Sequence, residues 1–363
     1  MTDRITVAGA EPYAVVVGAG ALAELEALVP DGAKRVAVMY QAAVADVVAE
    51  IEKVLAARCD VVPIEVPQGE HAKVAGVAVS AWDLFGSRGF TRSDLVIAVG
   101  GGAVTDVAGF VAATWLRGVR FIAVPTTLLG MVDAAIGGKT GINIGAGKNL
   151  VGAFHPPIGV ICDLDTLESL PRADFAAGLA EVVKAGFIAD PVILDLIESD
   201  PAAAAAATGP RTAELITRAV SVKATVVSAD LRETAPVGPG GLGREILNYG
   251  HTLAHAIEKR ENFRWRHGDA VSVGLVFAAA LSHAAGLLDR ETADRHRTVL
   301  DSIGLPTSYP AAAWPELRAA MNLDKKTRGR TLRFVVLEGL GQARILVDPD
   351  AVVLETAYAE VAR

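Results

Sequence analysis

Short apolar, strand-like runs alternate with helical periods through the first half of the chain, and this alternation constrains the fold more than any other feature. The strand-like runs are Ala14–Val17, Arg35–Tyr40, Asp60–Val66, Leu95–Val99, Arg120–Val124 and Ile158–Cys162. Strands that alternate with helices are typical of a mostly parallel sheet with helices on its faces. We therefore predict an α/β domain over residues 1–170.

The pattern changes after Leu170, and the remainder reads as a mainly α-helical domain over residues 171–363. The predicted helices are Ala173–Ile188, Arg211–Leu231, Arg244–Lys259, Asp269–Ala285 and Glu291–Ile303. Thr331–Leu337 and Ala343–Val347 flank two glycines and predict a small hairpin near the end.

Composition bounds the class of protein. A chain of 363 residues that is 52% hydrophobic is long enough for two domains. Its net charge of −8 predicts no nucleic-acid partner. Cys59 and Cys162 lie too far apart in sequence to indicate a disulfide framework or a cysteine zinc site. We expect no signal peptide, because the N-terminus shows no basic segment followed by an apolar one. We expect no membrane partner, because the uncharged run Ala270–Leu288 contains serines, a histidine and glycines typical of a buried helix. We therefore predict a cytoplasmic location.

Two glycine-rich segments predict anion binding. Asp133–Asn149 places two lysines and an aspartate on what reads as a long loop. Gly100–Asp106 joins a strand to a helix, where backbone amides and the positive end of the helix can approach a phosphate, although an ordinary glycine turn has the same pattern. Thr126 and Thr127 follow the next strand, at the sheet edge where open α/β proteins bind ligands.

Another glycine pair, Gly18 and Gly20, resembles a dinucleotide fingerprint but lacks its acidic partner. That motif expects an acidic residue at the end of the second strand, whereas this strand ends in Met39-Tyr40-Gln41. We therefore favour Gly100–Asp106 as the phosphate loop.

The helical half contains a candidate metal site. Three imidazole or carboxylate ligands with an open position are typical of catalytic zinc, and Glu181 with two histidines could supply them. Spacing alone does not choose among His251, His255 and His267. If Arg244–Lys259 is one helix, its side chains at Arg244, Asn248, His251 and His255 lie along one stripe. Glu181 and Lys184 are three residues apart and share one face of the predicted helix Ala173–Ile188. We expect structural or surface roles for the other histidines, which are His71, His155, His283 and His296.

Three motifs together resemble the 3-dehydroquinate synthase family of sugar-phosphate cyclases. They are Gly100-Gly-Gly-x-x-x-Asp106, Val124-Pro-Thr-Thr-Leu-Leu129 and Asp133-Ala-Ala-Ile-Gly-Gly-Lys-Thr140. The resemblance implies a Rossmann-like NAD-binding domain at 1–170 and a metal- and substrate-binding domain at 171–363. It implies conversion of 3-deoxy-D-arabino-heptulosonate 7-phosphate to 3-dehydroquinate and phosphate. The implied steps are transient oxidation by NAD, phosphate β-elimination, re-reduction and aldol closure.

The resemblance also assigns residues. It implies that zinc, with cobalt as a substitute, is bound by Glu181, His251 and His267, and that His255 transfers a proton. The implied substrate and catalytic residues are Arg117, Lys139, Lys148, Asn149, Lys184, Lys223, Arg244, Asn248, His255 and Lys325. The implied NAD-binding residues are Gln68, Gly69, Glu70, Lys73, Gly100, Gly101, Gly102, Thr105, Asp106, Thr126, Thr127, Asp133, Lys139, Lys148, Thr166, Leu167, Glu168 and Ser169.

Several points stay open at this level. Lys326 could exchange roles with Lys325, and Asp133 could orient either the cofactor or a lysine. Arg117 either complements the end of its helix or, as the family implies, reaches the phosphate of the neighbouring subunit in a homodimer. The segment Thr234–Gly241 belongs to a proline- and glycine-rich insertion, which predicts a surface loop.

Three other functions compete with this hypothesis. A metal-dependent glycerol or alcohol dehydrogenase shares the fold but does not need so many cations around one pocket. A cyclase that makes a valiolone or deoxyinosose product acts on substrates without a carboxylate, for which Lys223 and Arg244 would have no use. A non-enzymatic binding protein is disfavoured because every candidate catalytic position is filled.

Overall fold

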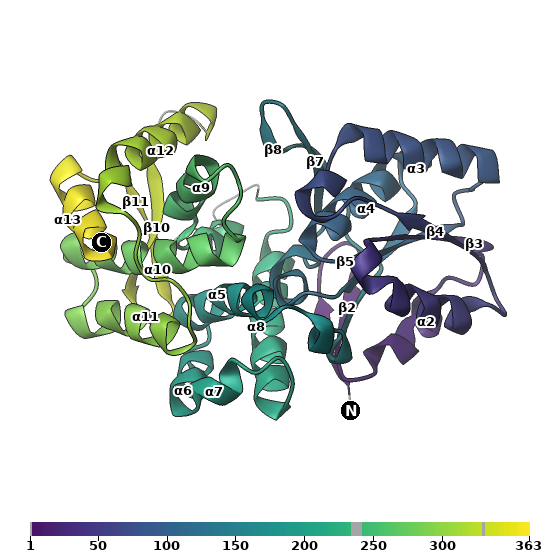
Figure 1. Cartoon of the computed structure of the whole chain (residues 1–363), viewed down its shortest axis with the longest axis horizontal. Coiled ribbons are helices and arrows are strands. Elements are labelled where there is room, and N and C mark those ends of the chain that lie inside the picture. The colour runs from purple at the N-terminus through teal and green to yellow at the C-terminus, as the bar shows by residue number, and fades with distance from the viewer. Residues whose placement is uncertain (1, 234–241, 329–330) are drawn as a thin grey trace. The chain divides into compact units, whose positions relative to one another are not determined.

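The computed structural model describes residues 2–233, 242–328 and 331–363, with the side chains of 323–328 left aside (Figure 1). The insertion Thr234–Gly241 and the side chains of Lys325 and Lys326 therefore lie outside the described residues. The chain forms two compact units, Met1–Leu170 with Lys223–Arg232, and Pro171–Val222 with Glu233–Arg363. The sequence places Lys223–Arg232 in the helical half, whereas its contacts group it with the first unit.

A seven-stranded, mostly parallel sheet forms the first unit and confirms the predicted α/β class. The strand order is β1-β2-β9-β6-β5-β3-β4, and only the pairing of β1 with β2 is antiparallel. All six predicted strands are present, and the unpredicted β1 lies at one edge. The strands are β1 (Asp3–Val7), β2 (Tyr13–Gly18), β3 (Arg35–Tyr40), β4 (Asp60–Glu65), β5 (Leu95–Gly100), β6 (Arg120–Pro125) and β9 (Gly159–Asp163).

Helices cover both faces of this sheet. Alternate residues of each strand point to opposite faces, and every residue of β5 is buried, as expected for a strand covered on both sides. Val48, Ile51 and Leu55 form the apolar stripe of one helix that packs on the sheet core. Figure 1 shows that helix, α2, on the opposite side of the strands from α3 and α4. The α-helices of this unit are α1 (Leu25–Leu28), α2 (Ala45–Leu55), α3 (Ala75–Arg88) and α4 (Gly102–Thr114).

The predicted loop between Asp133 and Asn149 is wrong, because most of it is an antiparallel hairpin. After a π-helix, η5 (Gly130–Ala134), β7 (Lys139–Ile144) pairs with β8 (Gly147–Phe154). Its glycines permit close backbone packing rather than flexibility: a Cβ on Gly152 would lie 2.2 Å from the carbonyl oxygen of Thr140. The glycines that suggested a loop instead allow the two strands of the hairpin to pack closely.

The second unit is mainly helical, as predicted, and is built around α10 (His267–Ala284). Nearly all of this helix is buried, and it contacts α5, α9, α11 and α13. No helix in the described part of the chain is both long and apolar enough to span a membrane. The other elements are α5 (Arg172–Ile188), α6 (Val192–Ser199), α7 (Pro201–Ala204), α8 (Pro210–Ala229), α9 (His251–Arg260), α11 (Arg290–Ser302), α12 (Trp314–Arg328), α13 (Ala351–Val361), and the hairpin β10 (Arg333–Gly339) and β11 (Gln342–Val347).

The predicted continuous helix Arg244–Lys259 is also wrong. A 3₁₀ helix, η7 (Gly243–Asn248), ends before Gly250, which has a φ of 79°, and α9 begins at His251. The break follows from backbone contact with α10, because a Cβ on Gly274 would lie 2.0 Å from the carbonyl oxygen of Gly250. Arg244 and Asn248 therefore share no helical stripe with His251 and His255.

Candidate active site

Three potential metal ligands converge within the second unit. Single donor atoms of Glu181, His251 and His267 all lie within 4.8 Å of one another. Oε1 of Glu181 is 3.5 Å from Nε2 of His251 and 3.3 Å from Nε2 of His267. Glu181 lies inside α5, whereas the two histidines are the first residues of α9 and α10. Because the helix breaks at Gly250, His251 is the first residue of α9.

Each histidine directs its other ring nitrogen toward a different acceptor. Nδ1 of His251 is 3.1 Å from the carbonyl oxygen of Tyr249. Nδ1 of His267 is 3.4 Å from Oε2 of Glu258, a buried carboxylate that the sequence analysis did not identify. Such outer acceptors select the tautomer whose Nε2 lone pair faces a metal.

The electrostatics of this cluster favour the metal-binding forms of Glu181 and His251 but the protonated form of His267. Burial raises the pKa of Glu181, but the charge of Lys184 and, to a smaller extent, the contacts with the two histidines lower it by more. The pKa of Glu181 therefore lies well below its usual range. Burial, and then the Lys184 ammonium, lowers the pKa of His251 to about 3. Burial also lowers the pKa of His267, but the carboxylates of Glu181 and Glu258 outweigh it and raise the value to about 10.

A metal ion fits this cluster on the evidence of its donors. Both carboxylate oxygens of Glu181 are buried and accept no hydrogen bond among the described residues, although they form ion pairs with Lys184 and the histidines. Two imidazoles and one carboxylate are a donor set that suits Zn²⁺ and Co²⁺. Lys184 also donates to the carbonyl oxygen of Leu247 at 2.8 Å, which directs its ammonium group.

Other predicted residues lie on the same elements. His255 is one turn along α9, and its ring meets that of His251 edge-on, with centroids 5.4 Å apart. Among the described residues, it is not part of the metal-ligand group. Arg244 is buried in η7, and Asn248 is half-buried at its end.

In the first unit, the predicted NAD-binding residues other than Asp133, Lys139 and Lys148 lie at the carboxyl ends of four parallel strands. Gln68–Lys73 come after β4, Gly100–Asp106 after β5, Thr126 and Thr127 after β6, and Thr166–Ser169 after β9. Parallel strands bring their carboxyl ends to one edge of the sheet, where open α/β sheets bind ligands. Gly101 and Thr127 are packed together there, since a Cβ on Gly101 would lie 3.2 Å from Cγ2 of Thr127.

The alternative glycine pair is already occupied. The amide of Gly20 donates to Asp163 at 3.1 Å and to Asp165 at 3.0 Å, and the amide of Leu22 donates to Asp163 at 2.8 Å. These carboxylates take the place that an anionic ligand would need, which favours Gly100–Asp106.

A buried lysine links the segment Gly100–Asp106 to the hairpin of β7 and β8. Nζ of Lys73 lies 2.5 Å from Oδ2 of Asp106 and 2.5 Å from Oδ1 of Asn149. Burial raises the pKa of Asp106 to about 6, although Lys73 opposes the shift. Asn149 has a φ of 56°, and its amide donates to Oδ1 of Asn143, a residue that sequence reasoning missed.

The remaining predicted cations of this unit differ in their surroundings. Lys223 is buried and pairs with Asp133 at 2.5 Å, so Asp133 contacts a lysine that is distant in sequence, whereas the sequence suggested the nearby Lys139. Nζ of Lys148 lies 3.6 Å from Oε1 of Glu70. Lys139 is exposed at the start of β7, and Arg117 is exposed with a φ of 69° at the end of η4 (Trp115–Arg117).

Three of the four histidines expected to have structural or surface roles make structural contacts, and the fourth, His71, is exposed. His155 stacks on Phe121, and His296 is fully buried, stacked on Phe187 and hydrogen-bonded to the hydroxyl of Tyr249 at 2.8 Å. Nδ1 of His283 lies 2.9 Å from the carbonyl oxygen of Leu288.

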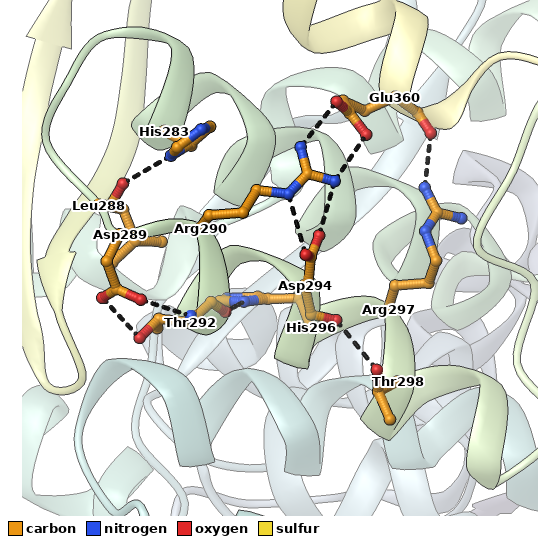
Figure 2. Close-up of polar contacts among 10 residues, drawn as sticks. All are labelled: His283, Leu288, Asp289, Arg290, Thr292, Asp294, His296, Arg297, Thr298 and Glu360. Carbon is orange, nitrogen blue, oxygen red and sulfur yellow. Dashed lines mark hydrogen bonds and ion pairs between the residues drawn. The ribbon is translucent and has the colours of Figure 1, made fainter.

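A cavity of about 390 Å³ lies between α10, α11 and α13, and its lining includes His283 but none of the three candidate metal ligands. Figure 2 shows that its charged groups pair with one another: Arg290 bridges Asp294 and Glu360, and Arg297 donates to the carbonyl oxygen of Glu360 at 2.5 Å. These ion pairs and hydrogen bonds connect α11 to α13. Because the charged groups already pair with one another, we assign this cavity no ligand.

Comparisons with known proteins agree over nearly the whole chain. Residues 63–177 match the family described as 3-dehydroquinate synthase N-terminal, and residues 178–327 match 3-dehydroquinate synthase C-terminal. The chain is 59% identical to a 3-dehydroquinate synthase from Streptomyces avermitilis over 355 residues, which cover 98% of this chain and 96% of the relative.

Two solved structures are also similar. A 2-deoxy-scyllo-inosose synthase complexed with carbaglucose-6-phosphate, NAD+ and Co2+ has a TM-score of 0.85 and 26% identity, covering 99% of this chain and 100% of that one. ValA, a 2-epi-5-epi-valiolone synthase from Streptomyces hygroscopicus subsp. jinggangensis 5008 with NAD+ and Zn2+ bound, has a TM-score of 0.84 and 28% identity, covering 96% of each chain.

Proposed function

The chain belongs to the 3-dehydroquinate synthase family, and from that premise we propose that it performs the synthase reaction with NAD and a divalent metal at the residues described above. The activity is that of a 3-dehydroquinate synthase in the shikimate pathway. Its substrate is a sugar phosphate, 3-deoxy-D-arabino-heptulosonate 7-phosphate, and its products are 3-dehydroquinate and phosphate. The observation that carries the metal and residue assignments is the convergence of Glu181, His251 and His267.

We assign the metal to Glu181, His251 and His267, with zinc as the expected ion and cobalt as a substitute. When bound, NAD supplies a reversible electron-pair acceptor and the metal supplies a Lewis acid. His255, next to His251 but outside the ligand group, would accept and return the proton of the substrate hydroxyl. Lys184, which pairs with Glu181, would present its ammonium group to the substrate.

The cations of the chain match the two anionic groups of the substrate. The buried Lys223 and Arg244 would bind its carboxylate and hydroxyl groups, and Lys148, Asn149, Arg117 and Lys325 would bind its phosphate. Lys223 already pairs with Asp133, but an ammonium has three donors and can hold two carboxylates. NAD would bind at the carboxyl edge of the sheet, along Gly100–Asp106, Thr126 and Thr127.

The dehydrogenase and cyclase alternatives are less well supported. The chain is 59% identical to a named 3-dehydroquinate synthase but only 26% and 28% identical to the two other cyclases. Those substrates lack the carboxylate that Lys223 and Arg244 would bind, and a dehydrogenase would need neither.

We also propose a homodimer in which Arg117 reaches the phosphate site of the partner subunit. In support, Arg117 is exposed, and its neighbour Leu116 is 38% exposed. The same unit also has Leu150 and Phe154, which are 61% and 43% exposed. Large contiguous patches of exposed apolar side chains often mark protein interfaces. The cytoplasmic location expected from the sequence stays a prediction.

Phosphate release and NADH absorbance, followed together, test this function. Purified protein is incubated with the heptulosonate phosphate, catalytic NAD and Zn²⁺, and the product is identified by mass. We expect phosphate equal to the substrate consumed and no accumulation of NADH, because the electrons removed are returned within one turnover. Stoichiometric NADH would establish the dehydrogenase alternative instead.

A further inference from the structure

Glu258 lies beside the metal-ligand cluster without belonging to it. Its carboxylate is buried, with the residue only 7% exposed, and Oε2 lies 3.4 Å from Nδ1 of His267. Glu258 is seven residues after His251 on α9, so both side chains project from the same face of that helix, two turns apart. One helix therefore supplies a candidate ligand at its first residue and a carboxylate to the other histidine.

The two ring nitrogens of His267 face two different carboxylates. Nε2 is 3.3 Å from Glu181, the candidate ligand, and Nδ1 is 3.4 Å from Glu258. A neutral imidazole has one N–H and one lone pair, and the group that accepts the N–H decides which nitrogen keeps the lone pair. If Nδ1 holds the hydrogen, the lone pair of Nε2 points toward Glu181 and the metal.

We propose that Glu258 is the positioning residue of the metal site, which accepts the Nδ1 hydrogen of His267 and thereby fixes the tautomer and orientation in which Nε2 binds the ion. This inference rests on the proposed metal site. Glu258 touches neither substrate nor cofactor in this role, and it acts only through His267. Its negative charge also makes the ligating nitrogen more basic, which strengthens metal binding.

The other ligand histidine provides an internal comparison. Nδ1 of His251 faces a neutral backbone carbonyl, that of Tyr249, at 3.1 Å. The same positioning task is thus performed by a charged acceptor at one histidine and by a neutral acceptor at the other. Only the charged acceptor is a side chain, so only Glu258 can be changed without altering the backbone.

The test measures Co²⁺ affinity by competition with a chromophoric chelator in the full-length protein. We expect Glu258→Ala to lower the affinity about 10- to 100-fold, the usual effect of removing an outer partner of a metal ligand. Glu258→Gln should lose less, because its amide oxygen still accepts the Nδ1 hydrogen but has no charge. The absorption spectrum of bound Co²⁺ should keep its shape in both variants, since the ligands themselves are unchanged.

Glu261→Gln is the matched control. Glu261 follows the same helix and contacts Arg260 and Tyr309 rather than a ligand histidine. The affinity of the Glu261→Gln variant for Co²⁺ should equal that of the wild type. At saturating Co²⁺, Glu258→Gln should regain most of its turnover, because a positioning residue acts on metal binding.

Other outcomes would overturn the inference. An unchanged affinity in Glu258→Ala, or an equal loss in Glu261→Gln, would show that Glu258 does not position His267. A changed Co²⁺ spectrum in Glu258→Gln would make Glu258 a direct ligand instead. If Glu258→Ala does not fold, as judged by circular dichroism, the glutamine variant decides the question. If wild-type protein binds no Co²⁺, or His251→Ala binds it as tightly as wild type, the proposed metal site itself fails.

Discussion

Nζ of Lys223 lies 2.5 Å from Oδ1 of Asp133, so a buried ammonium on α8 is held against a carboxylate of the π-helix η5 within the first unit. A lone lysine on an apolar helix is usually solvated, but this one has a charged partner. The pair fixes the direction of the ammonium, and an ammonium has three donors in all.

Lys223→Ala should therefore impair a carboxylated substrate more than an analogue without the carboxylate. A charge-assisted contact is worth about 1.5 to 3 kcal/mol, which corresponds to roughly a ten- to hundredfold loss in kcat/KM. The measurement compares this loss for the two substrates. Equal losses would mean that Lys223 acts through Asp133 and the fold rather than on the substrate.

The metal ligands can be separated from the proton-transfer residue by metal content. His251→Ala and His267→Ala should be purified with little Zn²⁺, because each removes one of three ligands. His255→Ala should keep its metal and lose turnover. Elemental analysis of the dialysed proteins measures this, and His283→Ala serves as a control for the loss of a histidine elsewhere in the unit. A metal-free His255→Ala would contradict the ligand assignment.

His296 should make the second unit less stable in acid. Burial lowers its pKa to about 3, although the hydrogen bond with Thr292 opposes the shift. The folded state therefore keeps His296 neutral, while the unfolded state takes up a proton below about pH 6.5. The stability from this group is present above about pH 6.5 and decreases as the pH falls toward 3.

Between pH 7 and pH 5 this linkage should remove about 2 kcal/mol of unfolding free energy. Denaturant unfolding of metal-free protein at the two pH values measures the loss. Glutamine does not titrate, so the unfolding free energy of His296→Gln should decrease between the two pH values by about 2 kcal/mol less than that of the wild type. His283→Gln should behave like wild type. The same pH dependence in His296→Gln would assign the loss to other groups.

Shared sites in a homodimer can be tested by complementation. Arg117→Ala and Lys148→Ala should each be nearly inactive. A co-refolded equal mixture contains about half heterodimers, each with one site that has both cations, so about a quarter of wild-type activity should return. If Arg117 acts within its own subunit, mixing restores nothing.

The sequence by itself determined the main architecture and the chemical content of the site. Uninterrupted apolar runs such as Leu95–Val99 have the length of strands rather than helices, and a sheet covered on both faces buries every residue of such a run. The motifs at Gly100–Asp106 and Asp133–Thr140 pointed to the family. The identities of Glu181, His251 and His267 as ligands came from the resemblance, because spacing left the choice among three histidines open.

Tertiary contact decided what local patterns could not. The glycines of Asp133–Asn149 suggested a loop, but close strand packing made them a hairpin. The helical period across Arg244–Lys259 was interrupted because Gly250 meets the backbone of Gly274 on another helix.

Glu258 and Asp133 gained their partners in the same way. Lys223 is 90 residues from Asp133, and His267 lies on a different helix from Glu258, so local propensity contains no information about either contact. The sequence thus set which chemical groups are present. Packing between elements decided which of them meet, because burial of charge is tolerated only where folding brings a partner within reach.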